Sequence, residues 1–374
     1  MAGGPGVPWD MRARVSIVVF AGLCLACSGA GEAGTGAAST SADGANTGPV
    51  SGTGGEVVTT GGGTSGQVTT GGGTSGQATT SGGTSSDATT GGGSSGTTGA
   101  AGCPERAPWG MWVWQPEQAT DPAKSALLLE FAAAHEVTHL YLESEALLVE
   151  DPSRLVAFIG EADAACVAVE LLFGAAAWAQ AEHHAEPLAL VEDALALVDG
   201  LVGPRPVGLH FDIEPHGLPD WDLDPEGYAG EYLDLLDMMA ANMQGSELSL
   251  TVDIAFWYDT VMVERDGAKR PLNELVQDRV DRVVVMDYRD HAEPPDGIID
   301  NAAAEVDYAE QVGGLVRVAV ESTCGIEPEK VTFCEEGSIA MFLALELTAS
   351  IYAASPAWDG VAVHDHAAWS VLMD

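Results

Sequence analysis

The chain has 374 residues with 56 acidic and 14 basic side chains, so its formal charge at neutral pH is −42. A surface this acidic repels phosphate groups, which argues against nucleic acid as a partner and against docking on anionic lipid. The first 102 residues carry only two basic and five acidic side chains. The other 272 residues therefore carry 12 basic and 51 acidic side chains, a net charge of −39, and we expect them to form the folded part.

The N-terminus has the features of an export signal. Arg12 and Arg14 precede an apolar run over residues 15–26, which is too short to span a bilayer as a mature helix. The run ends before Cys27 and a Ser-Gly pair, which resembles the bacterial lipoprotein cleavage site. Residues 1–27 are therefore predicted to be a lipoprotein-type signal peptide with lipidation at Cys27, the alternative being an ordinary secretory signal cut nearby. We expect an exported protein that is secreted or meets the membrane only through this lipid anchor.

Residues 28–102 lack the apolar periodicity of a folded segment. From Val58 onward a ten-residue unit rich in Gly, Ser and Thr repeats. The unit is too short and too polar to bury a core, so this segment is predicted to be a disordered linker.

Four cysteines follow the signal and linker, and export permits disulfide bonds between them. Cys324 and Cys334 flank a nine-residue segment and are predicted to close one loop. Cys103 and Cys166 are the remaining pair, with a buried free thiol at Cys166 as the alternative. None of these four cysteines forms a Cys-x-x-Cys pair with another, which argues against a cysteine zinc site.

From residue 103 to residue 374, apolar runs alternate with amphipathic segments. The runs are continuous and rich in Val, Leu and Ile, which is typical of parallel strands covered on both faces. Asp121, Asp151 and Asp224 each precede a proline, the start signal of a helix. This order predicts an α/β fold, a (β/α)8 TIM barrel over 103–374, with an open doubly wound sheet as the alternative. The expected strands are residues 110–114, 138–143, 167–173, 207–213, 248–257, 282–288, 316–321 and 360–364.

In such barrels the chemistry lies at the C-terminal ends of the strands. On the fourth strand, His210, Asp212 and Glu214 alternate with apolar residues and so share one face. Neighbouring carboxylates raise one another's pKa, which suits a general acid, although simple exposure at the strand mouth is the alternative. The aromatic residues on or beyond strand ends, whose flat faces suit sugar rings, are Trp112, Trp114, Trp178, Trp221, Trp257, Tyr288 and Trp369. The expected substrate-binding residues are Trp112, Trp114, Glu143, His210, Asp253, Trp257, Glu321 and His364.

Two short motifs resemble those of a known family. Residues 211–214 resemble the end of the Asp-x-x-Asp-x-Asp-x-Glu signature of chitinase-like family 18 glycoside hydrolases, and residues 286–288 resemble their sixth-strand Met-x-Tyr motif. The resemblance implies a glycosidase barrel acting on carbohydrate without a cofactor, and we expect a monomer. It implies that Glu214 is the general acid/base, that Asp212 supports the substrate N-acetyl group, and that Tyr288 assists. Other barrel glycosidases, including polygalactosaminidase-like ones, are alternatives, because His210 and His364 depart from the motifs.

Two mechanisms are compatible with these catalytic candidates. In the first, Glu214 protonates the glycosidic oxygen while the substrate's own acetamido oxygen attacks, oriented by Asp212 and Tyr288. In the second, Glu214 is the acid, and Asp287 or Glu321 is the nucleophile or base. Asp253 is expected to orient Asp212 or Glu214 in either case.

Two other function classes stay open. One is a catalytically inactive sugar-binding barrel. The other is a metal-dependent barrel enzyme, in which nitrogen and oxygen ligands would surround the mouth. Its possible ligands are His210, Asp212, Glu214, His216, Asp253, Asp287, Glu321, His364 and His366.

Overall fold

The computed structural model describes residues 102–104 and 106–374. The predicted signal peptide, the lipidation of Cys27 and the linker fall outside these residues. None of the helices in the described part of the chain is long and apolar enough to cross a membrane.

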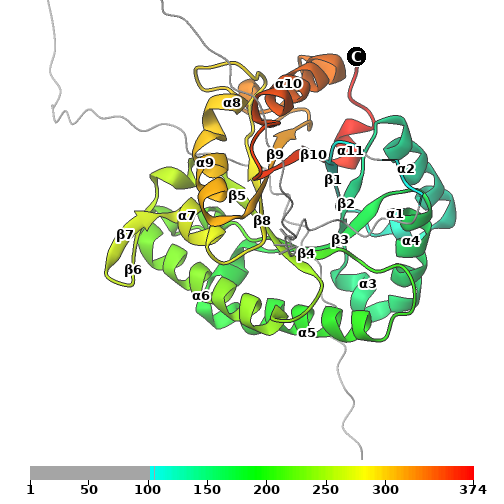
Figure 1. Ribbon diagram of the computed structural model, residues 1–374, viewed down its shortest axis with the longest axis horizontal. Coiled ribbons are helices and arrows are strands. Elements are labelled where there is room, and N and C mark those ends of the chain that lie inside the picture. The colour runs from blue at the N-terminus through cyan, green and yellow to red at the C-terminus, as the bar shows by residue number, and fades with distance from the viewer. Residues whose placement is uncertain (1–101, 105) are drawn as a thin grey trace, which may run out of the picture. The chain divides into compact units, whose positions relative to one another are not determined.

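Eight parallel strands close into a barrel in the order β1-β2-β3-β4-β5-β8-β9-β10, and β10 pairs with β1 (Figure 1). This confirms the predicted (β/α)8 TIM barrel and excludes the open sheet. The strands are β1 (Trp109–Val113), β2 (His139–Glu143), β3 (Ala168–Gly174), β4 (Gly208–Asp212), β5 (Ser249–Ala255), β8 (Arg282–Met286), β9 (Leu315–Glu321) and β10 (Trp358–His364).

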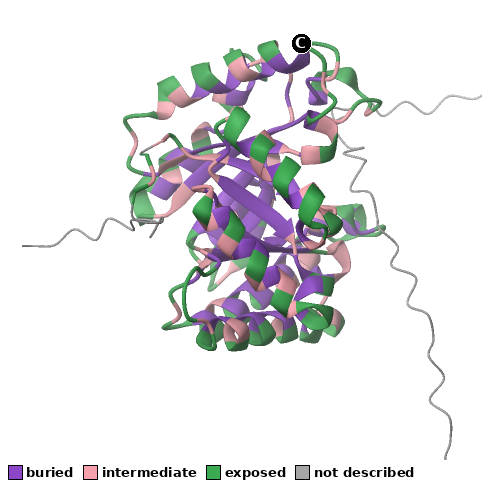
Figure 2. Ribbon diagram, turned by 90° about the vertical axis from the view of Figure 1, so that its right-hand side faces the viewer, coloured by how far each residue is buried: buried purple, intermediate pink, exposed green. Residues whose placement is uncertain are grey.

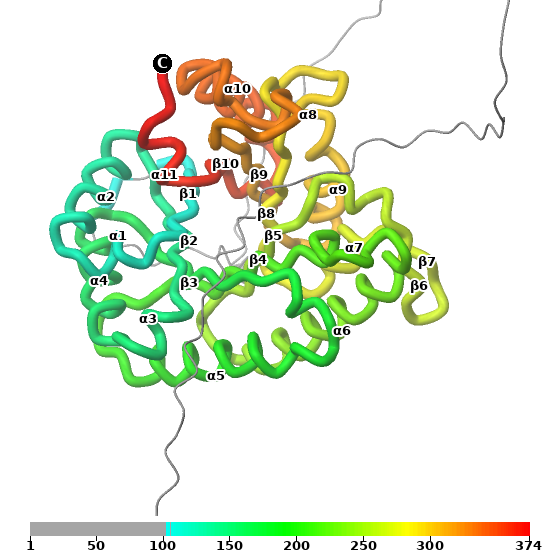
Figure 3. The backbone as a smooth tube through the Cα atoms, turned by 180° about the vertical axis from the view of Figure 1, so that it is seen from behind, coloured from blue at the N-terminus to red at the C-terminus, as the bar shows by residue number. Residues whose placement is uncertain are grey.

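The helices surround the barrel, as Figures 1 and 3 show from opposite sides. The three predicted aspartate caps are present: the side chains of Asp121, Asp151 and Asp224 each accept a hydrogen bond from a backbone N–H two or three residues on. The longer helices are α2 (Pro122–Ala134), α4 (Pro152–Ala164), α5 (Ala185–Asp199), α6 (Pro225–Met243), α9 (Ala303–Val312) and α10 (Gly337–Tyr352). The shorter ones are α1 (Glu117–Thr120), α3 (Glu145–Glu150), α7 (Leu272–Gln277), α8 (Ile298–Asn301) and α11 (His366–Trp369).

A β-hairpin after β5 was not predicted. It consists of β6 (Met262–Arg265) and β7 (Ala268–Pro271), which pair antiparallel. Asp266 and Gly267 form the turn with φ angles of 54° and 77°. Asp-Gly is a strong sequence signal for such a two-residue turn, so the hairpin could have been found.

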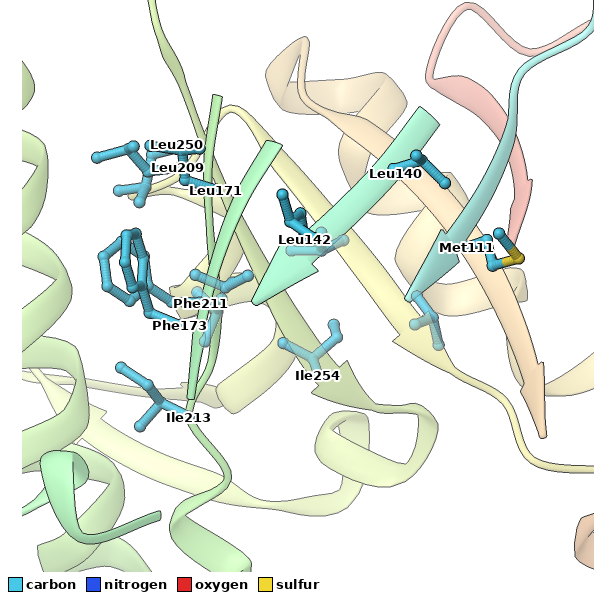
Figure 4. Packing of buried hydrophobic residues seen from close by; sticks show 14 of the residues in the cluster. Met111, Leu140, Leu142, Leu171, Phe173, Leu209, Phe211, Ile213, Leu250 and Ile254 are labelled. Carbon is cyan, nitrogen blue, oxygen red and sulfur yellow. The ribbon is translucent and has the colours of Figure 1, made fainter. Parts of the chain in front are cut away.

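The apolar core lies between the barrel and its helices. Figure 4 shows outward-facing side chains of neighbouring strands packed together, among them Phe173 of β3 and Phe211 of β4, whose ring centroids are 5.4 Å apart. Figure 2 shows the same division, with buried strands inside and exposed outer helix faces. Because strand side chains alternate, Phe211 outside places His210 and Asp212 inside the barrel.

Two disulfides tie loops to this framework. Cys324 pairs with Cys334, as the sequence predicts. Cys103 pairs with Cys166, which joins the start of the described domain to the loop between α4 and β3. Cys166 is therefore not a free thiol.

Candidate active site

Toward the N-terminal ends of the strands, the barrel interior holds buried charges rather than an apolar core. The guanidinium of Arg282 donates to Glu170 Oε1 at 2.8 Å and to Asp359 Oδ2 at 2.6 Å. Arg317, which is fully buried, donates to Asp359 Oδ2 at 2.6 Å and to the Tyr141 hydroxyl at 2.7 Å. Burial would raise the pKa of Glu170, but Arg282 and His210 outweigh it and hold that pKa well below its usual range. These pairs supply fixed charges under the mouth.

His210 lies between these buried ion pairs and the carboxylates at the mouth of the barrel. Its Nε2 lies 2.8 Å from Asp253 Oδ1, and its Nδ1 lies 3.5 Å from Glu170 Oε2. Burial would lower the pKa of His210, but these two carboxylates outweigh it and raise the pKa to about 9. The second oxygen of Asp253 accepts the indole N–H of Trp112 at 3.3 Å.

These three predicted substrate-binding residues are buried. His210, Asp253 and Trp112 have exposed fractions of 0%, 1% and 1%. Their contacts with one another hold them in place below the mouth.

The carboxyl pair of β4 stands at the mouth. Asp212 ends the strand and Glu214 follows it; the Glu214 side chain is 22% exposed and so is accessible. Burial and the charges of Glu214 and Asp253 raise the pKa of Asp212 well above its usual range, and Asp212 Oδ1 is buried without a hydrogen-bond partner. Burial and Asp253 raise the pKa of Glu214 to about 7. The pair therefore holds a transferable proton near neutral pH, as a general acid must.

Tyr288 belongs to the same mouth. Burial raises the pKa of its hydroxyl, and the carboxylates of Glu321, Glu214, Asp212 and Asp253 raise it further. Tyr288 therefore keeps its proton and can donate a hydrogen bond among these acids.

The two candidates for a second catalytic carboxylate, Asp287 and Glu321, both have hydrogen-bond partners within the protein. Asp287 is fully buried and accepts from Asn301 Nδ2 of α8 at 3.0 Å, so it faces the helix layer outside the barrel. Glu321 Oε1 accepts the backbone N–H groups of Ser322 and Thr323 at 2.8 and 2.7 Å. Glu321 Oε2 lies 2.8 Å from His364 Nδ1.

The other predicted binding residues surround the mouth. Trp114 is half-buried and donates its indole N–H to His364 Nε2 at 2.9 Å. Glu143 ends β2, and burial raises its pKa to about 7. Trp257 follows β5 and lies edge-on to His216, with ring centroids 5.1 Å apart.

The remaining tryptophans that the sequence placed at strand ends are core residues. Trp178, Trp221 and Trp369 are 4%, 7% and 2% exposed. Trp369 packs against Trp109 and Phe131 behind the barrel wall. Only Trp114 and Trp257 of the predicted tryptophans thus have exposed ring surface near the pair.

His216 is a site residue for which the sequence offered only a metal-ligand role. Its Nε2 lies 3.7 Å from Glu214 Oε1, and its Nδ1 lies 2.9 Å from the Tyr258 hydroxyl. Burial lowers the pKa of His216 to about 4, so the ring is neutral beside the acid. The sequence could have predicted this role, because His216 stands two residues beyond Glu214. Among residues 102–104 and 106–374, no three His, Cys, Asp or Glu side chains are grouped so that they could hold a metal ion.

Comparisons with known proteins give matches of structure only. No protein-family model matches the sequence, and no curated protein matches it. The fold is similar to a chitinase from Chromobacterium violaceum, at 12% identity over 71% of this chain and 97% of the chitinase, with a TM-score of 0.42. It is also similar to an endo-β-N-acetylglucosaminidase from Cordyceps militaris (13% identity, 72% and 85% covered, TM-score 0.44) and a D-psicose 3-epimerase from Clostridium cellulolyticum (10%, 69% and 84%, 0.41). Barrels host many chemistries, so the side chains of the mouth must decide the function.

Proposed function

We propose that this protein is a glycoside hydrolase that cleaves a polysaccharide at the mouth of the barrel, with Glu214 as the general acid/base. The observation that carries the proposal is the Asp212–Glu214 pair, in which burial and the charges of nearby carboxylates keep a proton at neutral pH beside an accessible surface. Donation of this proton to the glycosidic oxygen would make the departing sugar a neutral alcohol.

We further propose that the nucleophile is the substrate's own acetamido oxygen. The alternative needs a second carboxylate, but Asp287 faces Asn301 and both oxygens of Glu321 are engaged. Asp212 and Tyr288 carry protons with which they could orient an acetamido group. This mechanism predicts a substrate built from N-acetylated amino sugars.

The test compares two oligosaccharides that differ only in the acetamido group. Purified protein is assayed on a fluorogenic tetramer of N-acetylglucosamine and on the matching glucose tetramer. The proposal predicts hydrolysis of the first alone, and a loss of at least about 100-fold in kcat for Glu214→Gln, the usual contribution of a general acid. Glu346→Gln, on the exposed face of α10, is the matched control and should keep full activity.

Each result has a distinct meaning. Equal hydrolysis of both tetramers would refute the acetamido nucleophile, while full activity of Glu214→Gln would refute the assigned acid. Because Glu214 must be protonated and its pKa is raised to about 7, kcat/KM should fall as pH rises through 7.

We also propose that the protein is exported and tethered through a lipid at Cys27. The two disulfides of the folded domain support an oxidising location outside the cytoplasm. Mass spectrometry of the mature protein tests this, since the proposal predicts a new N-terminus at a lipid-modified Cys27. An unmodified Cys27 in the mature chain would refute it.

A further inference from the structure

The indole ring of Trp114 is held at two edges across the barrel mouth. At one edge its N–H donates to His364 Nε2 of β10. At the other edge lies Gly174, the last residue of β3, where an added Cβ would be 3.2 Å from Trp114 Cη2 and 2.9 Å from the Asp212 carbonyl oxygen. The ring also packs on the buried cluster that contains Trp112. The absence of a side chain at Gly174 thus leaves the space that the ring edge occupies beside Asp212.

The direction of each hydrogen bond behind this ring is fixed by chemistry. An indole N–H can only donate, so the bond forms when His364 is neutral, with Nε2 as the acceptor and the imidazole proton on Nδ1. That proton is donated to Glu321 Oε2 at 2.8 Å. Glu321 Oε1 is held in turn by the N–H groups of Ser322 and Thr323. The Glu321–His364 pair therefore selects one tautomer, and this tautomer is the one that can hold Trp114.

We propose that Glu321 and His364 are positioning residues that fix Trp114 as a stacking platform for the apolar face of a hexose ring beside Asp212. The inference rests on the proposed function only for the nature of the ligand. A flat aromatic face at the mouth offers the apolar contact that sugar rings seek, and a ring fixed before binding loses little conformational freedom on binding.

Protonation of His364 and the Trp114 hydrogen bond exclude each other. The groups that face His364 are Glu321, Asp212, Glu214, Tyr288 and its chain neighbour Asp365. Burial would lower the pKa of His364, but the carboxylates of Glu321, Asp365 and Asp212 outweigh burial and raise this pKa to about 9. A proton on Nε2 would place two donors against each other, so the indole bond opposes this rise. The platform should therefore tighten as pH rises through the pKa of His364.

The decisive variant is Glu321→Gln, which keeps the shape and does not touch Trp114. The two backbone N–H groups would retain the amide oxygen, so the amide NH2 would face His364 Nδ1 and force the proton onto Nε2. Two N–H donors would then meet, and Trp114 would lose its anchor. The probe is the N-acetylglucosamine tetramer. Its Kd is measured in the Glu214→Gln background, so that no turnover occurs, and at pH 10, where His364 is neutral.

We expect Glu321→Gln and Trp114→Phe each to weaken binding of this probe about 3–10-fold, the size of one aromatic contact or hydrogen bond. The double variant should bind no more weakly than the weaker single variant, because both act through the same ring. Glu346→Gln is the matched control with unchanged Kd. Unchanged binding in Glu321→Gln, or effects that add in the double variant, would overturn the inference.

A second readout needs no ligand. In 15N-labelled protein the Trp114 indole N–H should exchange with solvent at least about 10-fold faster in Glu321→Gln than in the parent protein. Trp114→Phe should raise the pKa of His364, followed by NMR, by about 0.5–1 unit. Unchanged exchange and an unchanged pKa would refute the hydrogen-bond chain from Glu321 through His364 to Trp114. If the parent binds no oligosaccharide while both NMR effects appear, the proposed substrate class is wrong and the hydrogen-bond chain is supported.

Discussion

The buried imidazolium of His210 makes the stability of the barrel depend on pH in a direction that can be tested. Its pKa rises from 6.5 to about 9 on folding, because Asp253 and Glu170 outweigh the effect of burial. A histidine whose pKa is raised stabilises the fold fully below its unfolded pKa of 6.5, and this contribution disappears as pH rises through 9. A change of this size corresponds to about 3 kcal/mol.

The perturbation is His210→Gln, which removes the charge but leaves a polar side chain of similar length. Urea unfolding of both proteins, followed by circular dichroism between pH 6 and pH 10, gives the free energy of unfolding at each pH. The difference between wild type and variant should shrink by about 3 kcal/mol from pH 6 to pH 10. A packing defect alone would give a difference that does not change with pH. Parallel curves would therefore refute the account of His210 as a buried cation.

Three further predictions concern the domain as a whole. Because residues 103–374 carry a net charge of −39, the melting temperature should rise by several degrees between low salt and about 0.5 M NaCl; a flat or falling melting temperature would count against self-repulsion. Loss of the Cys103–Cys166 bond, which spans 63 residues, should cost about 4 kcal/mol in denaturant, against about 3 for Cys324–Cys334, which spans 10. The reverse order would contradict the loop-length argument. Arg317→Leu should destabilise the barrel by about 1–3 kcal/mol in the same assay, since Asp359 keeps only Arg282 as a partner and the buried Tyr141 hydroxyl loses its donor; a change below about 0.5 kcal/mol would show that this interior tolerates the loss.

The barrel could be predicted from the sequence because its signals are local. Continuous apolar runs place the eight strands within a few residues of their observed positions, and three Asp-Pro pairs place three helix starts. The hairpin at 262–271 was missed although its Asp-Gly turn was present. The Cys103–Cys166 bond could not be decided, because it depends on which loops the fold brings together.

The arrangement of side chains at the mouth could be predicted from the sequence only in part. Alternation along β4 identified Asp212 and Glu214, but the same rule applied to the adjacent Asp287 and Tyr288 forbids both from facing the mouth. The engagement of Glu321 by His364 depends on contacts between strands 43 residues apart in sequence. The ion pair between Arg282 and Glu170 spans 112 residues, so no local pattern reveals it.

The most direct test of the central claim is a crystal structure of Glu214→Gln with the N-acetylglucosamine tetramer bound. We predict that a glycosidic oxygen lies within about 3.2 Å of the side chain at position 214, the reach of a general acid. We also predict that the acetamido group of the adjoining sugar contacts Asp212 and Tyr288. A tetramer bound away from the mouth of the barrel, or with its glycosidic oxygens out of reach of position 214, would contradict the assignment of Glu214 as the acid.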